Sequence, residues 1–434
     1  MKTLGLMLVM FVSVAVLNQP LIAQSNLELS QDNPGLSHLR THPVPSWFFQ
    51  IETHGVKPWP AFPVAGLRLW DTGTKWSDLN PSDGVYDWTQ LDKWLSAAKQ
   101  HGTNEILYTL AMTPQWASSS PGDTTCRYSP GACDPPEDLN PDGSGTDQHF
   151  KDFVRAIATH AAGRIGYWEI WNEPAMGFYW NGTFAQMARM AQDARTVVLS
   201  IDPKAKLLTP PNGAEDAWAQ KWWTGYGAAG GLQYADIAAL HGGPHSDCGN
   251  PPQAADFIPI VQNLRTILAS FHQGKPIWDT ESNWGDVNKN CFTDPDLQAA
   301  FLAQFHFLHR SMEVVRLYWY SYADPNVGQL FDTNTGELTK GGVAYQQVQN
   351  WMLEKTLRGC SSNNTIWTCR FTTLHGYVGE AIWDTAQSCS HGSCQTVGYP
   401  VGKIYTQYRT LSGETVPITN GEVPIGAKPI LVEK

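Results

Sequence analysis

Two glutamates, far apart in the chain, each follow an apolar run that is rich in aromatic residues. Glu173 lies in Tyr167-Trp-Glu-Ile-Trp-Asn-Glu-Pro174, and Glu281 lies in Lys275-Pro-Ile-Trp-Asp-Thr-Glu-Ser-Asn-Trp284. Proline disfavours helical geometry at the residue before it, so Pro174 predicts that a strand ends at Glu173. Breaking a glycosidic bond needs two such carboxyl groups, one protonated to release the leaving oxygen and one ionised to attack or stabilise the anomeric carbon. The two segments therefore predict a glycosidase pair.

Two glutamates can take different roles when their surroundings differ. Apolar surroundings raise the pKa of one carboxyl group, and a nearby cation lowers the pKa of the other. Arg68, at the end of an earlier apolar run, is the candidate cation that keeps Glu281 charged. Three further acidic residues of these runs are interpreted as structural or supporting, namely Glu169, Asp279 and Asp71.

The elements that must position these residues alternate between short apolar runs and longer amphipathic stretches. Strands are predicted at 67–70, 105–110, 165–171, 207–208, 237–240, 277–278 and 314–320. Helices are predicted at 91–98, 150–162, 184–201, about 254–272 and 296–312. Such alternation over about 300 residues indicates a parallel sheet covered by helices, and a count near eight favours a closed (β/α)₈ barrel (a TIM barrel). No GxGxxG follows a strand, which argues against a nucleotide-binding sheet.

The composition changes after residue 353. Short β-rich runs are separated there by Gly, Pro and Asn, which is typical of a small antiparallel sheet or sandwich of about 80 residues. The predicted organisation is thus a signal peptide at 1–23, a catalytic barrel at 24–352 and a β-sandwich domain at 353–434. In a barrel of this kind the active site forms at the carboxyl ends of the strands, where Glu173 and Glu281 are expected.

The first residues are typical of a segment that directs export. Lys2 supplies a positive charge, residues 4–17 form an apolar run, and Ala23 is a small residue suited to cleavage. The alternative is a retained membrane anchor, but the run is shorter than the ~20 apolar residues that span a bilayer. We therefore expect a secreted protein that has no membrane partner after cleavage.

Eight cysteines follow this segment, an even number that favours disulfides in an exported chain. Short spacings suggest the pairs Cys126–Cys133, Cys360–Cys369 and Cys389–Cys394, which leaves Cys248–Cys291 by elimination. This is one of 105 possible pairings. No CxxC pair is present, and His241, His245 and Asp247 match no fixed-spacing ligand motif, so neither a metal nor another cofactor is expected.

Charge and aromatic content bear on the partner. The net charge of −11 argues against nucleic acid or an anionic membrane surface. The 19 tryptophans offer flat apolar faces that suit the C–H faces of sugar rings, although many of them belong in the core. Trp116 and Trp284 stand near predicted rim loops, where each could either stack on sugar or pack its loop. A carbohydrate is the expected substrate.

The two glutamate segments also resemble a known group of enzymes. Trp168-Glu-Ile-Trp-Asn-Glu-Pro174 is similar to the strand-four motif of clan A glycoside hydrolases, and Trp278-Asp-Thr-Glu281 is similar to their strand-seven motif. The closest resemblance is to glycoside hydrolase family 39, and it extends over residues 60–330. Further matching segments are Arg68-Leu-Trp-Asp71, Trp76, Gly84-Val-Tyr-Asp-Trp88, Thr113-Pro-Gln-Trp-Ala117 and 236–241.

The resemblance implies roles for individual residues. By position, Glu173 corresponds to the acid/base, Glu281 to the nucleophile and Asn172 to the residue that bonds the sugar 2-hydroxyl. Arg68 would orient Glu281, and His241 would border the site. Aromatic residues of strand eight, Trp319 or Tyr320, would form the floor of the −1 subsite. This sequence departs from the pattern at 242–245, Gly-Gly-Pro-His, where relatives often place a tyrosine.

Together these features predict a secreted retaining β-glycoside hydrolase that acts by double displacement, and the aromatic content and long 118–147 loop favour endo action on a polysaccharide. Three alternatives remain open: an exo-acting, β-xylosidase-like enzyme, a carbohydrate-binding barrel without catalysis, and a transglycosylase that uses the same two glutamates.

Overall fold

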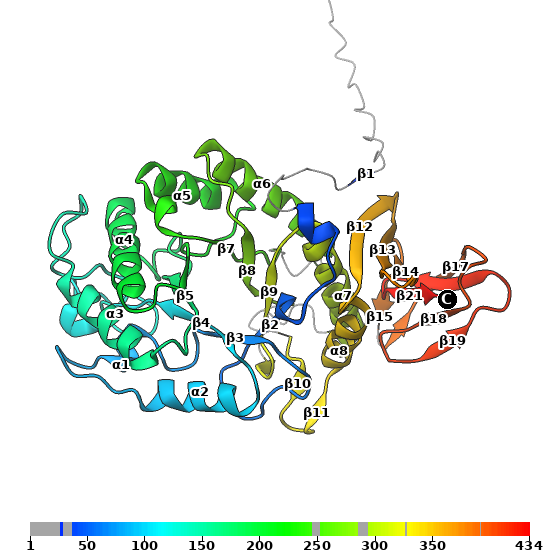
Figure 1. The fold of residues 1–434 in the computed structure, drawn as a ribbon, viewed down its shortest axis with the longest axis horizontal. Helices are drawn as coiled ribbons and strands as arrows, with labels where there is room; N and C mark the ends of the chain where they lie inside the picture. Colours follow the sequence, from blue (N-terminus) through cyan, green and yellow to red (C-terminus); the bar gives the residue numbers. More distant parts are fainter. Residues whose placement is uncertain (1–26, 29–36, 245–251, 285–293, 326–327, 391) are drawn as a thin grey trace, which may run out of the picture.

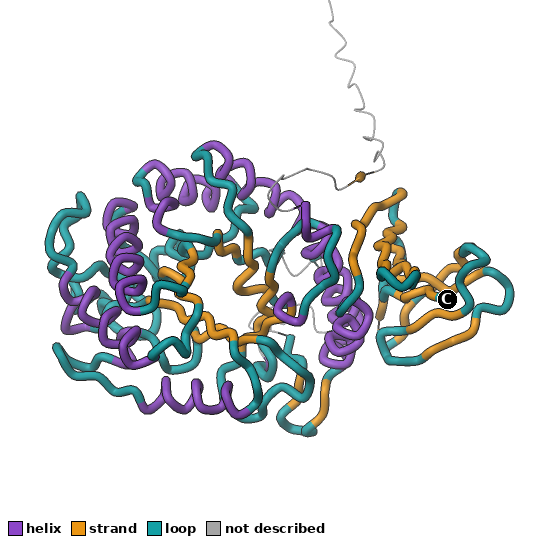
Figure 2. Tube along the Cα trace, in the orientation of Figure 1, coloured by secondary structure: helices purple, strands orange, loops and turns teal. Residues whose placement is uncertain are grey.

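Eight parallel strands form a ring that is surrounded by helices (Figure 2). The computed structural model describes residues 27–28, 37–244, 252–284, 294–325, 328–390 and 392–434. Around the ring the order is β6-β5-β4-β3-β2-β9-β8-β7, and the parallel bridges Leu208–Ile237 and Asn212–Leu240 join its two ends. The predicted barrel is confirmed.

The strands of the ring are short and nearly all of their residues are buried. They are β2 (Phe49–Glu52), β3 (Gly66–Leu69), β4 (Glu105–Leu110), β5 (Tyr167–Ile170), β6 (Lys206–Leu208), β7 (Ala238–Leu240), β8 (Ile277–Ser282) and β9 (Arg316–Tyr320). Successive side chains alternate between the interior of the barrel and the helix layer. The side chains that point into the barrel form one apolar cluster, which consists of Leu107, Leu208, Ile237, Ala239, Trp278 and Tyr318.

The helices cover the outside of the ring. They are α1 (Trp76–Leu79), α2 (Thr89–Gln100), α3 (Gln148–Ala161), α4 (Phe184–Ile201), α5 (Ala217–Ala228), α6 (Phe257–Ser270), α7 (Pro295–Ser311) and α8 (Lys340–Met352). Short 3₁₀ helices occur at η1 (Ser37–Arg40), η2 (Ser46–Phe48), η3 (Gln115–Ala117), η4 (Gly231–Tyr234) and η5 (Ala254–Asp256). Local sequence explains where α4 begins, because Thr183 and Gln186 form a reciprocal capping box.

The region after α8 is antiparallel, as predicted. A seven-stranded sheet, which β1 from the start of the chain joins, has the order β1-β12-β13-β14-β21-β18-β19. Separate pairs are formed by β15 with β16 and β17 with β20, and β10 pairs with β11 before α8. The bounds are β1 (Leu27–Glu28), β10 (Phe331–Asp332), β11 (Glu337–Leu338), β12 (Thr356–Asn363), β13 (Ile366–Thr372), β14 (Val378–Asp384), β15 (Cys389–Ser390), β16 (Ser393–Cys394), β17 (Thr396–Pro400), β18 (Gln407–Arg409), β19 (Thr415–Pro417), β20 (Glu422–Gly426) and β21 (Ile430–Glu433).

Strands β12 to β21, drawn in orange to red in Figure 1, follow α8, and β12 lies against α7. The Phe307 ring of α7 is 5.7 Å from Phe371 of β13 and 6.3 Å from Trp351 of α8, measured between ring centroids. A second apolar cluster between β14, β20 and β21 includes Val423 and Ile425. The barrel and the sheet therefore share a packed interface.

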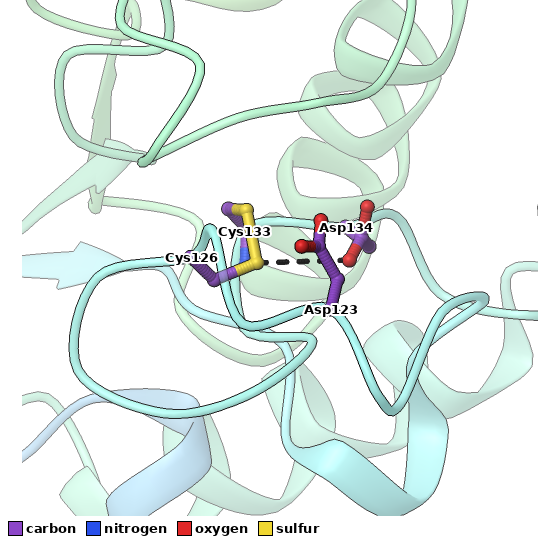
Figure 3. A group of neighbouring side chains, drawn as sticks. All are labelled: Asp123, Cys126, Cys133 and Asp134. Carbon is purple, nitrogen blue, oxygen red and sulfur yellow. Dashed lines mark hydrogen bonds between the residues drawn. A yellow bond between two sulfur atoms is a disulfide. The ribbon is translucent and has the colours of Figure 1, made fainter.

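Three of the predicted disulfides are confirmed, Cys126–Cys133, Cys360–Cys369 and Cys389–Cys394. The fourth predicted pair, Cys248–Cys291, and the expected signal peptide lie outside the described residues. Cys126–Cys133 closes a turn in the long loop between β4 and α3, with the carboxylates of Asp123 and Asp134 beside it (Figure 3). In the part of the chain that is described, no helix has the length and apolar character needed to cross a bilayer.

Candidate active site

Arg68 lies at the centre of a polar cluster inside the carboxyl end of the barrel. Its side chain is fully buried on β3. It donates to Glu281 Oε2 at 2.7 Å and to Glu52 Oε2 at 3.0 Å, both through Nη1. Its Nε donates to Glu169 Oε2 at 2.8 Å, and its Nη2 donates to Asn172 Oδ1 at 2.7 Å. One guanidinium thus fixes side chains from β2, β5 and β8.

The loop after β5 projects the Glu173 carboxyl into this end of the barrel. Trp171 and Glu173 have φ values of 60° and 41°, in the left-handed region that non-glycine residues seldom adopt. Backbone strain of this kind persists where surrounding contacts impose it, often at functional sites. Here the Trp171 N–H donates to Leu110 O at 3.0 Å, and its indole N–H donates to Tyr179 O at 2.7 Å.

Glu281 reaches the same space because β8 contains a register irregularity between Asp279 and Ser282. By strict alternation, residues 279 and 281 would face the same side of the strand. Instead Asp279 contacts His309 of the helix layer, 2.7 Å from its Nε2, whereas Glu281 points inward to Arg68. Bulges redirect side chains in this way at barrel rims.

His241 lies between the two glutamates. Its Nδ1 is hydrogen-bonded to Glu173 Oε1 at 2.9 Å, and its Nε2 is 3.9 Å from Glu281 Oε2. One oxygen of Glu173, one oxygen of Glu281 and one nitrogen of His241 all lie within 4.8 Å of one another. A pocket opens beside them, and its lining residues are Glu173, Ala175, Met176, Asn212, Gly213, Glu215, Trp218, Ala219, His241, Gly243, Glu281, Ser282 and Asn283.

Burial controls the electrostatics of this cluster. It raises the pKa of Glu52 well above its usual value, and the Glu281 and Asp71 charges add to this rise while Arg68 opposes it. Burial also raises the pKa of Glu281, and His241 and Arg68 act against that rise. For His241, burial lowers the pKa, but the carboxylates of Glu281 and Glu173 outweigh it, and the net pKa is raised. Arg68 therefore favours the charged form of Glu281, as expected of a cation, without overcoming burial.

The raised pKa of Glu52 predicts a pH-dependent gain in stability for Glu52→Gln. The folded protein holds a proton on Glu52 at pH values where the unfolded chain has lost it, so this stability contribution is complete below the unfolded pKa of about 4.3 and is lost as pH rises through the folded pKa. The variant lacks this loss, so urea unfolding is expected to show its stability rising relative to wild type between pH 4.5 and 8. A constant difference across that range would contradict the assignment.

Tyr320 and Asp71 lie close enough to Glu281 for their charges to interact with it, and neither lines the pocket. The Tyr320 hydroxyl donates to Asp71 Oδ2 at 2.9 Å, and the Tyr128 hydroxyl donates to Asp71 Oδ1 at 2.9 Å. Burial and the charge of Glu281 raise the pKa of Tyr320. The phenol of Tyr320 therefore stays protonated and faces the cluster.

The structure does not bring three of the proposed tryptophans to the pocket. Trp319 is fully buried in the helix layer, where it stacks on His306 with ring centroids 6.0 Å apart. Trp284 is buried against Phe301 of α7 at 5.0 Å. Trp116 is held in its loop by an indole N–H bond to Asn80 O at 2.8 Å. Each packs its own segment.

Sequence reasoning missed Glu52, Asn212 and Trp218. Glu52 follows the mainly apolar segment 48–51, Phe-Phe-Gln-Ile, as Glu173 follows its own aromatic segment, and this signal was available. Trp218 stands in a helix that was not predicted, and Asn212 in a loop of small residues and prolines. Nothing in their spacing marks them.

Two groups among the described residues could offer atoms to a metal ion. In the first, Asp123 and Asp134 flank Cys126 and Cys133, whose sulfurs are joined in a disulfide and cannot act as thiolate ligands (Figure 3). The second is Glu173, His241 and Glu281.

No protein-family model matches the sequence, and no curated protein matches it either. Solved structures do. A family 39 glycoside hydrolase from Bacteroides cellulosilyticus superposes with a TM-score of 0.65 at 15% identity, covering 91% of this chain and 81% of that one. A family 39 β-xylosidase from Caulobacter crescentus gives 0.59 at 16% identity, with 90% and 97% covered.

A family 44 xyloglucanase from Paenibacillus polymyxa gives a TM-score of 0.55 at 11% identity, covering 90% of this chain and 97% of that one. At these identities the similarity establishes the fold. The structural neighbours are clan A-like glycoside hydrolase barrels, which confirms the predicted resemblance at the level of architecture.

Proposed function

We propose that this chain is a retaining β-glycoside hydrolase that cleaves a polysaccharide, with Glu281 as nucleophile and Glu173 as acid/base. The observation that carries the proposal is the separation of their carboxyl groups, which present oxygens within 4.8 Å of each other beside one pocket. Retaining enzymes hold the two groups about 5–5.5 Å apart, whereas inverting enzymes leave about 6.5–9.5 Å for a water molecule.

In the first step, a Glu281 oxygen attacks the anomeric carbon and forms an ester to the sugar. The glycosidic C–O bond breaks, and Glu173 gives its proton to the departing oxygen. In the second step, the Glu173 carboxylate takes a proton from water, whose oxygen displaces Glu281 from the anomeric carbon. Two inversions return the original anomeric configuration.

The neighbours of the two glutamates suit these steps. Arg68 donates to Glu281 and to Asn172 Oδ1, which leaves the Asn172 amide N–H₂ to bond a sugar 2-hydroxyl. The backbone strain at Glu173 fixes the direction of its carboxyl group. Relatives often have a tyrosine at the segment that corresponds to 242–245, which this chain lacks. Here His241 is bonded to Glu173 and places a nitrogen 3.9 Å from Glu281, so we propose that His241 is the neighbour of Glu281 from the end of β7.

The substrate class is proposed from the fold comparison and the open pocket. Among the similar folds are a xyloglucanase bound to xyloglucan and a bifunctional glucanase–xylanase, both of which act on polysaccharides. A β-xylosidase and a glucosidase are also similar, so exo action is the competing outcome. Three disulfides support an extracytoplasmic site of action.

An array of plant and microbial polysaccharides tests the proposal. We expect oligosaccharide products whose newly formed reducing ends appear first in the β configuration, followed by ¹H NMR before mutarotation. Release of monosaccharide alone would replace endo by exo action. Products that appear first in the α configuration would overturn the retaining mechanism.

A further inference from the structure

Trp218 is exposed at the pocket that holds the two glutamates. All 19 tryptophans lie in the described residues, and Trp218, with 51% of its surface exposed, is the only one of them that is mainly open to solvent. It lines the same pocket as Glu173 and Glu281. An exposed indole lacks the stabilisation that burial of its large apolar surface would bring. A ligand that stacks on the ring would cover this surface.

The packing of α5 does not require Trp218. Trp222 and Tyr226 stack at 5.1 Å between centroids, and Trp223 is buried with its indole N–H donating to Gly213 O at 2.9 Å. Asp216 caps the helix by accepting from Ala219 N at 2.7 Å. These contacts fix the first turn of α5 and present the Trp218 ring on a rigid support.

The pocket lies on the leaving-group side of the proposed reaction. Its lining comes from the segments that follow β5, β6 and β7 and from the carboxyl end of β8. The residues that surround Glu281 from β3 and β9, Arg68 and Tyr320, do not line it. Because Glu173 gives its proton to the departing oxygen, the sugar attached to that oxygen must lie on the side of Glu173, next to the β6–α5 segment.

The wall of the pocket combines apolar and polar groups as a sugar ring requires. Trp218 and Met176 supply apolar surface, and the polar residue Glu215 also lines the pocket. Asn212 is buried, and its Oδ1 accepts from Ala175 N at 3.0 Å, so its orientation is fixed. Its Nδ2 is buried and has no hydrogen-bond partner among the described residues, so Asn212 brings an unused donor to the lining of the pocket.

We propose that Trp218 is the stacking platform of a subsite for the sugar on the leaving-group side of the scissile bond, with Asn212 as a donor to its hydroxyls. This inference rests on the proposed function and deepens it. The ring is a neutral hexose or pentose, because the carboxyl groups of Glu173, Glu215 and Glu281 around the pocket disfavour a uronic acid.

Two substrates separate this subsite from the chemistry. The probes are a β-linked tetrasaccharide and the β-glycosyl fluoride of the sugar that the wild type releases in the polysaccharide array. Fluoride leaves without occupying the subsite. We expect Trp218→Ala to lower kcat/KM on the tetrasaccharide roughly tenfold, mainly through KM, and to leave turnover of the fluoride unchanged. Trp218→Tyr is expected to restore most of the loss, since a flat ring remains.

Leu374→Ala is the matched control, because Leu374 is 96% exposed in the turn between β13 and β14 and does not line the pocket. An equal loss on both probes would show a merely structural role for Trp218 and overturn the inference, as would no loss on either. Failure of the proposed function reads differently, because the wild type would then release no sugar from the polysaccharide array and would not cleave the tetrasaccharide. In that case calorimetric binding of the tetrasaccharide to wild type and to Trp218→Ala still decides the subsite, and equal affinity would overturn it.

Discussion

Replacing Glu281 by Gln is expected to abolish turnover, with kcat reduced roughly 10⁴-fold or more, as is typical when a covalent nucleophile is removed. The amide keeps the shape of the side chain, and its oxygen can still accept the Arg68 bond that measures 2.7 Å in the native protein. It cannot form the ester to the anomeric carbon. Steady-state kinetics on the best polysaccharide of the array measures the loss.

The same variant is expected to stay folded and to gain stability relative to wild type above about pH 4.5. Burial raises the pKa of Glu281, so the native protein is the form that holds the proton, and wild-type stability falls as pH rises through the folded pKa. Thermal unfolding across pH 4.5–8 checks this. A loss of turnover with a lowered melting temperature would instead indicate damage to the fold.

A labelling experiment separates the enzyme from a barrel that only binds carbohydrate. A 2-deoxy-2-fluoro glycosyl fluoride slows the second step more than the first, and it is expected to leave an adduct on the peptide that contains Glu281. Mass spectrometry detects it in wild type and not in the Gln variant. Equal inertness of both proteins over the whole glycan array would favour the binding protein.

The sequence predicted the strands that carry the glutamates because each has a strong local signal. An apolar run followed by Pro174 or by polar residues marks the end of a strand, and the repeated spacing of apolar residues gave α4 its observed bounds. The first strand of the barrel, β2, was not predicted. All four of its residues are buried, so it lacks the alternation that identifies a half-exposed strand. Helix α5 was also missed, because its two glycines, Gly225 and Gly227, have a low helix propensity.

The side-chain directions at the rim could not be read from the sequence. Trp319 and Tyr320 are adjacent and both aromatic, so the sequence does not show which of them faces the interior of the barrel. In the structure Trp319 lies in the helix layer and Tyr320 points into the barrel. At β8 the irregularity after Asp279 reverses the expected direction of Glu281. Pairing register and bulges depend on the neighbouring strands, which are distant in sequence.

Glu52 shows how the cluster depends on the closed fold. Its partner Arg68 lies 16 residues away on the next strand, and the other carboxylates bound to Arg68 come from positions 169 and 281. Only closure of the ring brings the three carboxylates to one guanidinium. Burial raises the pKa values of Glu52 and Glu281, and the neighbouring carboxylates add a smaller contribution to each rise.

Replacing Arg68 by Met is therefore expected to have the largest effect on stability, a loss of about 3–5 kcal/mol at pH 7, because a buried cation is removed and its carboxylates remain. Without the guanidinium, the native carboxyl groups bind protons more tightly, so the deficit is expected to shrink as pH falls toward 4.5. Urea unfolding followed by circular dichroism over pH 4.5–8 measures it. Arg195→Met, which breaks a partly exposed pair with Asp236, is the control, with an expected loss of at most about 1 kcal/mol.

A second substitution shows whether the loss arises from charge. In Arg68→Met/Glu52→Gln one of the stranded carboxylates is gone, so part of the stability is expected to return, and the coupling between the two sites is the quantity that the double-mutant cycle isolates. Arg68→Lys, which keeps the charge but cannot span Glu52, Glu169, Glu281 and Asn172 with one planar group, is expected to fold and to lose turnover. Additive losses, or a deficit that does not change with pH, would show that Arg68 contributes packing alone.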